Sequence, residues 1–241
     1  MYIRDLDVIK IAYVIEGELV NQTPLSIGAG RGALVGGIDN PIVRMSKVPY
    51  IPGSSLKGVL RSEAERYVKS VFPSEFVCNI LNPTDKGSGE LGRKEKFKEN
   101  YEPCIICRIF GGPTLASHIM ICNAFPFSSF STETKTSVSL NRITGAQHPG
   151  RLFDTEYVVP LTKFKFDMRV DNIDVLGESA EAKVVRYLID ILMKGQVWLG
   201  GRKSVGMGNV KLVDVKMSKI EFKNGQITEE DVTKAYLSRG A

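Results

Sequence analysis

Four cysteines indicate a possible metal site in the middle of the chain. Cys104 and Cys107 are separated by two residues, a spacing that lets both sulfurs hold one zinc ion. Cys78 upstream and either Cys122 or His118 downstream would complete a tetrahedron around that ion. A disulfide or a set of buried thiols accounts for the same residues, and one such pair of cysteines does not decide between them. Structural zinc and metal-free thiols therefore both stay open.

A second group of residues could hold a polyanion at the start of a helix. Pro52-Gly53 marks a turn, and either hydroxyl of Ser54-Ser55 can accept the free N–H groups of the first helical turn. Lys57 and Arg61 follow four residues apart, on one flank of the helix and close to an end that favours phosphate. The alternative is an ion pair between Arg61 and Glu65, one turn later on a solvated face.

The loop 200–208 is a third candidate for contact with phosphates. Its glycines expose N–H donors, and Arg202 and Lys203 add positive charge. It is not a nucleotide P-loop, because the glycine spacing differs and because a strand, not a helix, is expected after it. A turn that only reverses the chain is the alternative, and the two cations favour phosphate contact.

Asp39 ends another glycine-rich loop, at 25–39, and stands between Arg31 and Arg44. An aspartate before Asn40-Pro41 is usually a turn cap. A carboxylate in a basic loop weakens the binding of a polyanion, however, so its presence favours chemistry or a metal ion there. The spacing shows no Ser/His/Asp set and no paired carboxylates, so the residue types alone give little support for catalysis.

The composition narrows the class of protein. Of the 241 residues, 43% are hydrophobic and 24% are charged, as in ordinary globular proteins, and no apolar run is long enough to span a bilayer. The first residues lack the features of a secretory signal, so we expect a cytoplasmic protein with no membrane partner. The formal net charge of +5 suits a polyanionic partner without proving one.

Hydrophobic periodicity predicts the elements that must position these residues. We expect strands at 7–20, 116–125, 163–170 and 210–217, and helices at 54–71 and 179–194. This order predicts an α+β fold with a ferredoxin-like (RRM-like) core and large insertions, in one domain over residues 1–241.

Three further segments are interpreted from their composition. Residues 79–103 are highly charged and are interpreted as a mobile insertion, and 127–156 as a projecting hairpin. The chain from Thr228 is expected to form a short helix. The strand at 163–170 alternates apolar and mostly basic residues, which predicts a sheet with one cationic face.

Four segments together resemble the RAMP superfamily of CRISPR effector proteins. They are residues 38–41, 48–61 and 107–111 and the loop 200–208. Their order and spacing are similar to those of the repeated backbone subunit of type III (Csm/Cmr-like) interference complexes. The resemblance implies an RRM-like palm, a β-hairpin thumb at 127–156, a lid, and a chain that self-associates as a helical filament along a CRISPR RNA (crRNA).

The same resemblance implies roles for individual residues. Asp39 falls where the type III backbone subunit keeps an aspartate that cuts target RNA with a divalent metal, Mg²⁺ or Mn²⁺. Arg31 and Arg44 beside it, and Arg142 and Arg151 in the thumb segment, are expected to face RNA. The residues expected to hold the guide backbone are Gly53, Ser54, Ser55, Lys57, Arg61, Arg202 and Lys203.

Three functions follow as alternatives. The first is a backbone subunit that binds crRNA and cleaves target RNA at Asp39, together with other subunits of the complex. The second is a non-catalytic crRNA-binding scaffold. The third is a stand-alone endoribonuclease that processes the guide precursor, which such enzymes commonly do with a histidine near the first helix. Neither His118 nor His148 lies there, so this third function is the least supported.

Overall fold

The computed structural model describes residues 6–30, 37–72, 77–78, 103–112, 115–223 and 225–240. Arg31 and nearly all of the predicted insertion at 79–103 lie outside the described residues. No helix in the described part of the chain is both long and apolar enough to cross a membrane.

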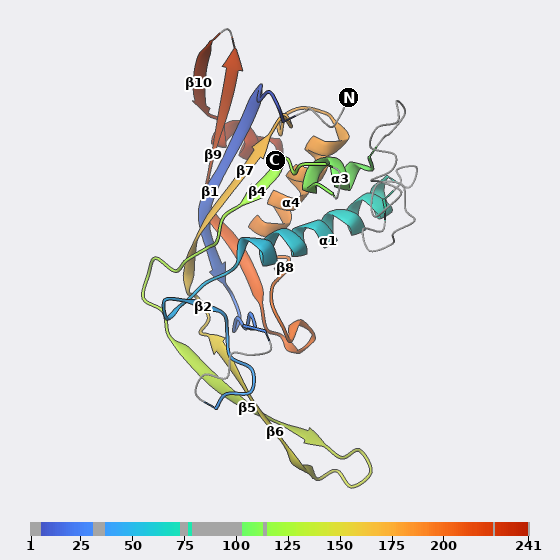
Figure 1. Ribbon diagram of the computed structural model, residues 1–241, viewed down its shortest axis with the longest axis vertical. Coiled ribbons are helices and arrows are strands. Elements are labelled where there is room, and N and C mark those ends of the chain that lie inside the picture. The colour runs from blue at the N-terminus through green and yellow to red at the C-terminus, as the bar shows by residue number, and fades with distance from the viewer. Residues whose placement is uncertain are drawn as a thin grey trace.

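An antiparallel sheet forms the main body of the molecule, with its strands side by side in the order β10, β9, β1, β7, β4 (Figure 1). These strands are β1 (Ile11–Asn21), β4 (Ile119–Ile121), β7 (Lys163–Asp171), β9 (Asn209–Lys223) and β10 (Gln226–Asp231). Helix α1 (Gly53–Val71) connects β1 to β4 by way of shorter elements, and α4 (Ala180–Met193) connects β7 to β9. The chain order β1, α1, β4, β7, α4, β9 and the sheet order β9, β1, β7, β4 are those of a ferredoxin-like core. The predicted α+β fold is confirmed.

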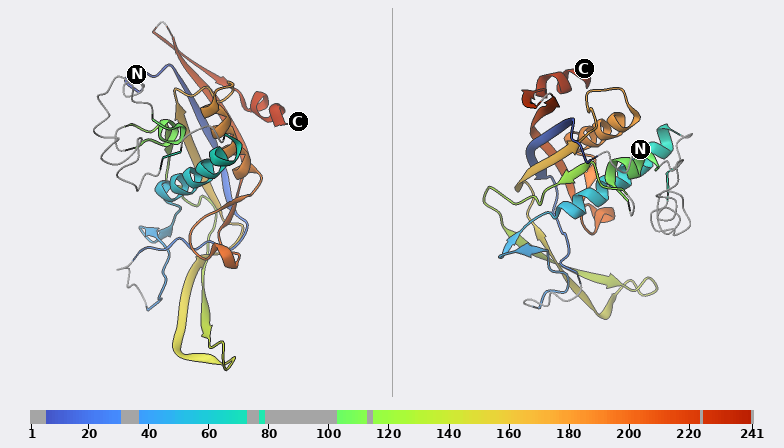
Figure 2. Two further views of the ribbon diagram at one scale, coloured as in Figure 1. Left: turned by 90° about the vertical axis from the view of Figure 1, so that its right-hand side faces the viewer. Right: turned by 45° about the horizontal axis from the view of Figure 1, so that its top comes forward.

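Both long helices cover the same face of the sheet, as Figure 2 shows from two sides. The strands turn alternate apolar side chains toward this face, because successive residues of a strand point to opposite sides. The helices supply apolar stripes at a spacing of three or four residues, and the rings of Tyr67 and Tyr187 stack at 4.0 Å where α1 meets α4. The fully or almost fully buried residues of this layer include Tyr13, Ile15, Leu19, Phe164, Phe166, Met168, Val170, Leu56, Leu60, Ala64, Val68, Val184, Val185 and Leu188.

The opposite face of the sheet is not the cationic surface that the alternation in β7 predicts. Lys163 Nζ lies 2.8 Å from Glu18 Oε2, and Lys165 Nζ lies 4.0 Å from Glu16 Oε1. Both glutamates come from β1, which pairs with β7 in antiparallel register. The neighbouring strand therefore neutralises the lysines, and their charge is not available as a continuous basic surface.

A two-stranded hairpin projects beyond one end of the sheet, at the bottom of Figure 1. It consists of β5 (Thr132–Leu140) and β6 (Gln147–Val158), in agreement with the predicted hairpin at 127–156. We call it the thumb hairpin. Its base is attached to the sheet by reciprocal main-chain hydrogen bonds between Leu25 and Val158. The buried side-chain amide of Asn21 also donates to the carbonyl of Val159, at 2.9 Å.

The prediction of a short helix in the chain from Thr228 is confirmed in part, because the helix is present but begins later than Thr228. Strand β9 continues to Lys223, and Thr228 lies in β10, which pairs back onto β9. A short helix follows only at α5 (Thr233–Leu237). The remaining elements are β2 (Arg44–Met45), β3 (Val48–Pro49), α3 (Ile105–Phe110), β8 (Val197–Trp198), η2 (Lys203–Val205) and η3 (Ser238–Gly240).

Candidate nucleic-acid interface and cysteine cluster

Asp39 is exposed at the base of the thumb hairpin, where its Oδ2 accepts the main-chain N–H of Asp154 at 2.8 Å. Two further main-chain bonds hold the loop against β6: Asn40 N–H donates to the carbonyl of Asp154, and Glu156 N–H donates to the carbonyl of Asn40. The carboxylate of Asp154 accepts the hydroxyl of Thr136 at 2.6 Å. Asp39 is thus fixed against the main chain of β6 by a contact that spans 115 residues of sequence.

Arg44 takes part in an ion pair at the same base. Its guanidinium forms a bidentate pair with Glu156, with Nη1 2.7 Å from Oε2, and the side chain of Glu156 is only 7% exposed. Glu156 Oε2 also accepts the N–H of Ile42 at 3.1 Å. The hydrogen bond from Arg44 lowers the pKa of Glu156 below its ordinary value. Arg44 is predicted to face RNA, but its positive charge is used in this ion pair, which links β2 to β6.

The loop 200–208 also reaches the thumb hairpin. Arg202 adopts a left-handed backbone conformation, and its guanidinium lies over the ring of Phe153, 4.5 Å from the ring centre. Its Nη1 donates to Ser137 Oγ at 3.3 Å. Lys203 is exposed at the start of η2, and the loop leads into β9 as predicted. Phe153 directly precedes Asp154 in β6, so this loop and the Asp39 loop meet on neighbouring residues of one strand.

Helix α1 begins at Gly53, and Pro52 is its N-cap residue. The prediction that Ser54 or Ser55 caps the helix is wrong, because both serines lie inside the first turn and no side chain caps it. Gly53 N–H donates to Asn123 Oδ1 at 2.9 Å, and a Cβ at this position would lie 2.2 Å from the carbonyl oxygen of Ile121, so only glycine fits. The first turn has no acidic residue, so the helix dipole favours an anion there; Ser55 N–H donates to the carbonyl of Pro52, which leaves the N–H of Ser54 suited to an anion.

The two cations predicted to hold the guide from α1, Lys57 and Arg61, have different partners. Lys57 Nζ donates to Ser117 Oγ at 2.7 Å, and among the described residues no carboxylate lies within ion-pair distance of it. Burial, and after it the charge of Arg61, lowers the pKa of Lys57. Arg61 Nε lies 3.1 Å from Glu65 Oε1, so the ion pair considered as an alternative is present. Lys57 is the cation of the two that keeps an uncompensated charge.

Two more predicted RNA contacts lie on the thumb hairpin. Arg142 is in the turn that joins β5 to β6, and Arg151 is on β6; both are exposed. His148, also on β6, is half-buried.

Three cysteines form a buried cluster beside α1, which we call the cysteine cluster: Cys78, Cys104 and Cys107. The sulfur of Cys78 lies 3.3 Å from that of Cys107 and 3.4 Å from that of Cys104. These separations exceed the bond of about 2.05 Å in a disulfide, so the disulfide alternative is wrong. Cys104 is the N-cap residue of α3, and its Sγ accepts the N–H of Cys107. Shared hydrogen bonds, first with Cys107 and then with Cys78, lower the pKa of Cys104.

The structure brings neither predicted fourth ligand to the cysteine cluster. Cys122 is exposed directly after β4, beside the first turn of α1. His118 is buried, and its Nδ1 lies 2.8 Å from the carbonyl oxygen of Asp171. Within the described ranges the cluster consists of three sulfurs, all within 4.8 Å of one another. This donor set fits three of the four positions around a zinc ion.

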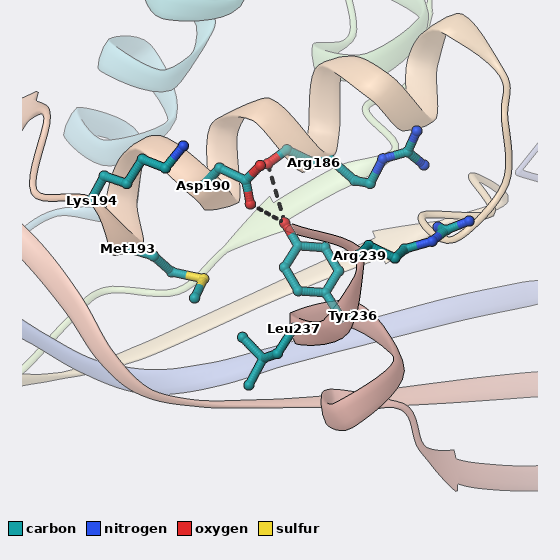
Figure 3. A pocket seen from close by; sticks show the side chains of 7 residues that line it. All are labelled: Arg186, Asp190, Met193, Lys194, Tyr236, Leu237 and Arg239. Atoms are coloured by element: carbon teal, nitrogen blue, oxygen red, sulfur yellow. Dashed lines mark hydrogen bonds between the residues drawn. The ribbon is translucent and has the colours of Figure 1, made fainter. Parts of the chain in front are cut away.

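A cavity of about 440 Å³ lies between α4 and the C-terminal helix, away from both groups of residues (Figure 3). Tyr236 donates its hydroxyl to Asp190 Oδ1 at 2.8 Å and to the carbonyl of Arg186 at 3.2 Å. Burial raises the pKa of Tyr236, so the phenol stays protonated and keeps both bonds. The cavity contains none of the residues predicted to act on RNA, and these contacts hold the C-terminal helix on α4.

Known proteins of related sequence cover most of the chain. The sequence model of the RAMP superfamily matches residues 18–211, which include Asp39, α1, the cysteine cluster and the loop 200–208. The protein "CRISPR system Cms endoribonuclease Csm3" of Methanothermobacter thermautotrophicus is 31% identical, over 91% of this chain and 87% of that protein. The protein with the same name in Methanocaldococcus jannaschii is 26% identical, over 87% of this chain and 82% of its own length. The one in Mycobacterium tuberculosis is 47% identical, over 84% of this chain and 86% of its own length.

Proposed function

The chain belongs to the RAMP superfamily, and on that premise we propose that it is the backbone subunit of a type III CRISPR interference complex, which binds guide crRNA and cleaves complementary target RNA. The observation that carries this proposal is the position of Asp39, an exposed carboxylate held on β6 where two loops meet. The name endoribonuclease carried by the relatives supports the cleavage step.

The guide backbone is proposed to follow the start of α1 and the loop 200–208. The first turn of α1 offers the N–H of Ser54, and Lys57 adds a charge without a carboxylate partner in the described structure. Lys203 is exposed, and the planar guanidinium of Arg202 keeps edge donors for a phosphate while its face rests on Phe153. Such contacts hold a phosphate chain irrespective of its bases, which a guide of arbitrary sequence requires.

The proposed cleavage is an attack of a ribose 2′-hydroxyl on the adjacent phosphate of the target. The 2′-oxygen bonds to phosphorus, the bond from phosphorus to the 5′-oxygen breaks, the 2′ proton passes to a base, and the 5′-oxygen takes up a proton. The products are a 2′,3′-cyclic phosphate and a 5′-hydroxyl. Asp39 positions or deprotonates the 2′-hydroxyl, and the thumb hairpin holds the target backbone in line for the attack.

A divalent cation, Mg²⁺ or Mn²⁺, is part of this proposal. Mg²⁺ in nucleic-acid sites is usually held by one or two carboxylates, with phosphates and waters completing its coordination. Asp39 offers an exposed carboxylate at the base of the thumb hairpin, so this residue fits such an ion as its protein ligand. When bound, the ion supplies positive charge for the phosphate during attack.

We further propose that the cysteine cluster holds a structural zinc ion through Cys78, Cys104 and Cys107. The support is the buried position of three sulfurs within reach of one ion, with an N–H bond to Cys104 that favours a thiolate. The role of such an ion is to hold α3 and the chain around Cys78 together, since metal binding and folding are coupled.

The assembly follows from the same proposal. Copies of this chain associate side by side along one crRNA as a helical filament, with other subunits of the complex, in the cytoplasm. Residues 1–241 act as one domain in this assembly, with the family match over 18–211 as support.

The test uses the assembled guide complex, a labelled complementary RNA and Mg²⁺ or Mn²⁺. The natural protein should cut the target at regular intervals, and Asp39→Asn should lower the cutting rate by about 100-fold or more at unchanged guide binding. Asp154→Asn is the matched control and should retain most activity, because Asp39 contacts only the main-chain N–H of Asp154. A target with a 2′-deoxynucleotide at the cut position should resist cleavage.

Three other outcomes would redirect the proposal. Intact guide binding without any cutting by the natural protein would leave the scaffold function. Full cutting by Asp39→Asn would place the chemistry on other residues. Cleavage of a guide precursor without target would indicate the stand-alone endoribonuclease.

A further inference from the structure

Arg61 is predicted to lie with Lys57 along the guide, but its side chain runs in a different direction. Its guanidinium reaches α3, where Nη1 donates to the carbonyl of Gly111 at 3.0 Å and Nη2 lies 3.7 Å from Cys107 Sγ. The side chain is only 16% exposed. With Nε directed to Glu65, each of the three guanidinium nitrogens has a partner inside the protein. The orientation of Arg61 is therefore set by α3 and the cysteine cluster.

The contact with Cys107 matters because of the charge that a metal would create there. Three thiolates around a divalent cation carry a net charge of −1, and all three cysteines are buried. A buried charge without a partner is costly, and a guanidinium is the cation best suited to such a place because it is delocalised and weakly hydrated. Donors to ligand atoms are also a general feature of metal sites, where they orient the ligand and adjust its charge.

We propose that Arg61 is the outer-shell cation of a zinc site in the cysteine cluster: Nη2 donates to the Cys107 sulfur, and Nη1 anchors the side chain on the carbonyl of Gly111. This inference rests on the zinc proposed above. Glu65 completes the arrangement from the solvent side, where its side chain is 28% exposed and its charge is partly screened. Cations at two positions of one helix then serve two sites, Lys57 the guide and Arg61 the metal.

The anchor at Gly111 explains why the site needs arginine and not lysine. Gly111 is the C-cap residue of α3, and its carbonyl lies at the end of the helix that also carries Cys107. The rigid guanidinium reaches this carbonyl and the sulfur at the same time, whereas an ammonium group is a single point charge. Arg61 thereby joins α3 to α1 at two points, the carbonyl of its C-cap residue and the sulfur of Cys107.

The experiment compares Arg61→Gln, Arg61→Lys and Lys57→Gln in the full-length chain. Zinc per chain and its affinity against a competing chelator are measured, together with the absorption spectrum after Co²⁺ substitution. Arg61→Gln should weaken zinc affinity by about 10- to 100-fold, Arg61→Lys by less, and Lys57→Gln should leave it unchanged.

Binding of a single-stranded guide RNA is measured for the same variants over a range of salt concentrations. Lys57→Gln should reduce the slope of log K against log salt by about 0.7, the value for one lost phosphate contact on a single strand, and Arg61→Gln should keep the slope of the natural protein. Arg61→Gln is thus expected to lose zinc affinity and keep the phosphate contacts, whereas Lys57→Gln is expected to lose a phosphate contact and keep zinc affinity.

The possible failures are distinguishable. If the natural protein retains no zinc and shows no Co²⁺–thiolate absorption, the zinc site and the role of Arg61 both fall. If it binds zinc and Arg61→Gln binds it equally well, only the role of Arg61 is wrong. A reduced salt slope in Arg61→Gln with unchanged zinc would assign Arg61 to the guide. Should Arg61→Gln fail to fold, unchanged zinc affinity in Arg61→Lys would overturn the bidentate role.

Discussion

The base of the thumb hairpin around Asp39, called the thumb base below, and the cysteine cluster both bring reactive side chains together. They differ in exposure and in the contacts that hold these side chains. Asp39 is exposed and is held mainly through main-chain hydrogen bonds of its loop to β6. The three cysteines are buried and are held by α3 and the packed core around it. The thumb base is open to a large partner, whereas the cysteine cluster is closed to one.

This difference separates a site that acts on a substrate from a site that supports the fold. A carboxylate at the surface can meet an incoming RNA, and main-chain contacts keep its position without occupying all of its oxygen lone pairs. Buried thiols cannot reach a polymer, but they can bind one ion and join segments that lie far apart in the sequence. Loss of the first site should change activity, and loss of the second should change stability.

The largest expected effect is on the cysteine cluster. Cys107→Ser should lower the free energy of unfolding by about 4 kcal/mol, because loss of a buried structural metal is among the most costly substitutions. Urea unfolding followed by circular dichroism, with zinc content, measures this. Cys122→Ser, at an exposed cysteine, should change the free energy by less than about 0.5 kcal/mol. Equal unfolding midpoints for the two variants would show that the cluster does not support the fold.

A smaller effect is expected from the ion pair at the thumb base. Glu156→Gln should lower the free energy of unfolding by about 2 kcal/mol, the usual range for a hydrogen bond to a charged group. Glu133→Gln is the control on the exposed strand of the thumb hairpin, where the carboxylate accepts the hydroxyl of Tyr157, and should have almost no effect.

The same ion pair should make stability depend on pH. Because Arg44 lowers the pKa of Glu156 in the folded protein, the stabilisation is complete above 4.5, the ordinary value, and is lost as the pH falls through the lowered value. Urea titrations at several pH values should therefore show the natural protein and Glu156→Gln converging in acid. A constant difference down to the lowest pH would contradict the linkage.

The smallest effect is expected where the loop 200–208 meets the thumb hairpin. A double-mutant cycle with Arg202→Met and Phe153→Leu should give a coupling energy of about 0.5 to 1 kcal/mol, as for a partly exposed cation over an aromatic ring. The free energies of unfolding of the four proteins give this value directly. Additive effects would mean that the loop and the thumb are energetically independent.

Local patterns in the sequence predict much of the fold, because they depend on spacing within one element. Strict alternation in β7 and the four-residue spacing of Leu56, Leu60, Ala64 and Val68 are properties of single elements, and the structure confirms them. β10 was missed, since 226–231 has no alternation of buried and exposed residues and is ordered by pairing with β9. The prediction of a cationic face was wrong for a related reason: the glutamates that neutralise the lysines of β7 belong to another strand, β1.

The candidate sites also differ in whether they depend on residues close together in the sequence or on contacts between distant segments. The spacing of Cys104 and Cys107 within one turn of α3 and the proximity of Lys57 to the start of α1 are local, and both are found in the structure. Asp39, by contrast, receives its hydrogen bond from a residue 115 positions away, and Arg44 finds Glu156 at a distance of 112 positions. No spacing rule reports such contacts.

The sequence by itself therefore determined which residues could do chemistry and which elements carry them, since residue type, cap positions and periodicity act over a few residues. Tertiary structure alone decided how the cations are used. Within the described ranges Lys57 has no carboxylate partner, Arg44 is paired with Glu156, and Arg61 is turned toward a sulfur. The physical reason is that a charge acts on whatever lies within a few ångströms, and the packing of distant segments decides what lies there.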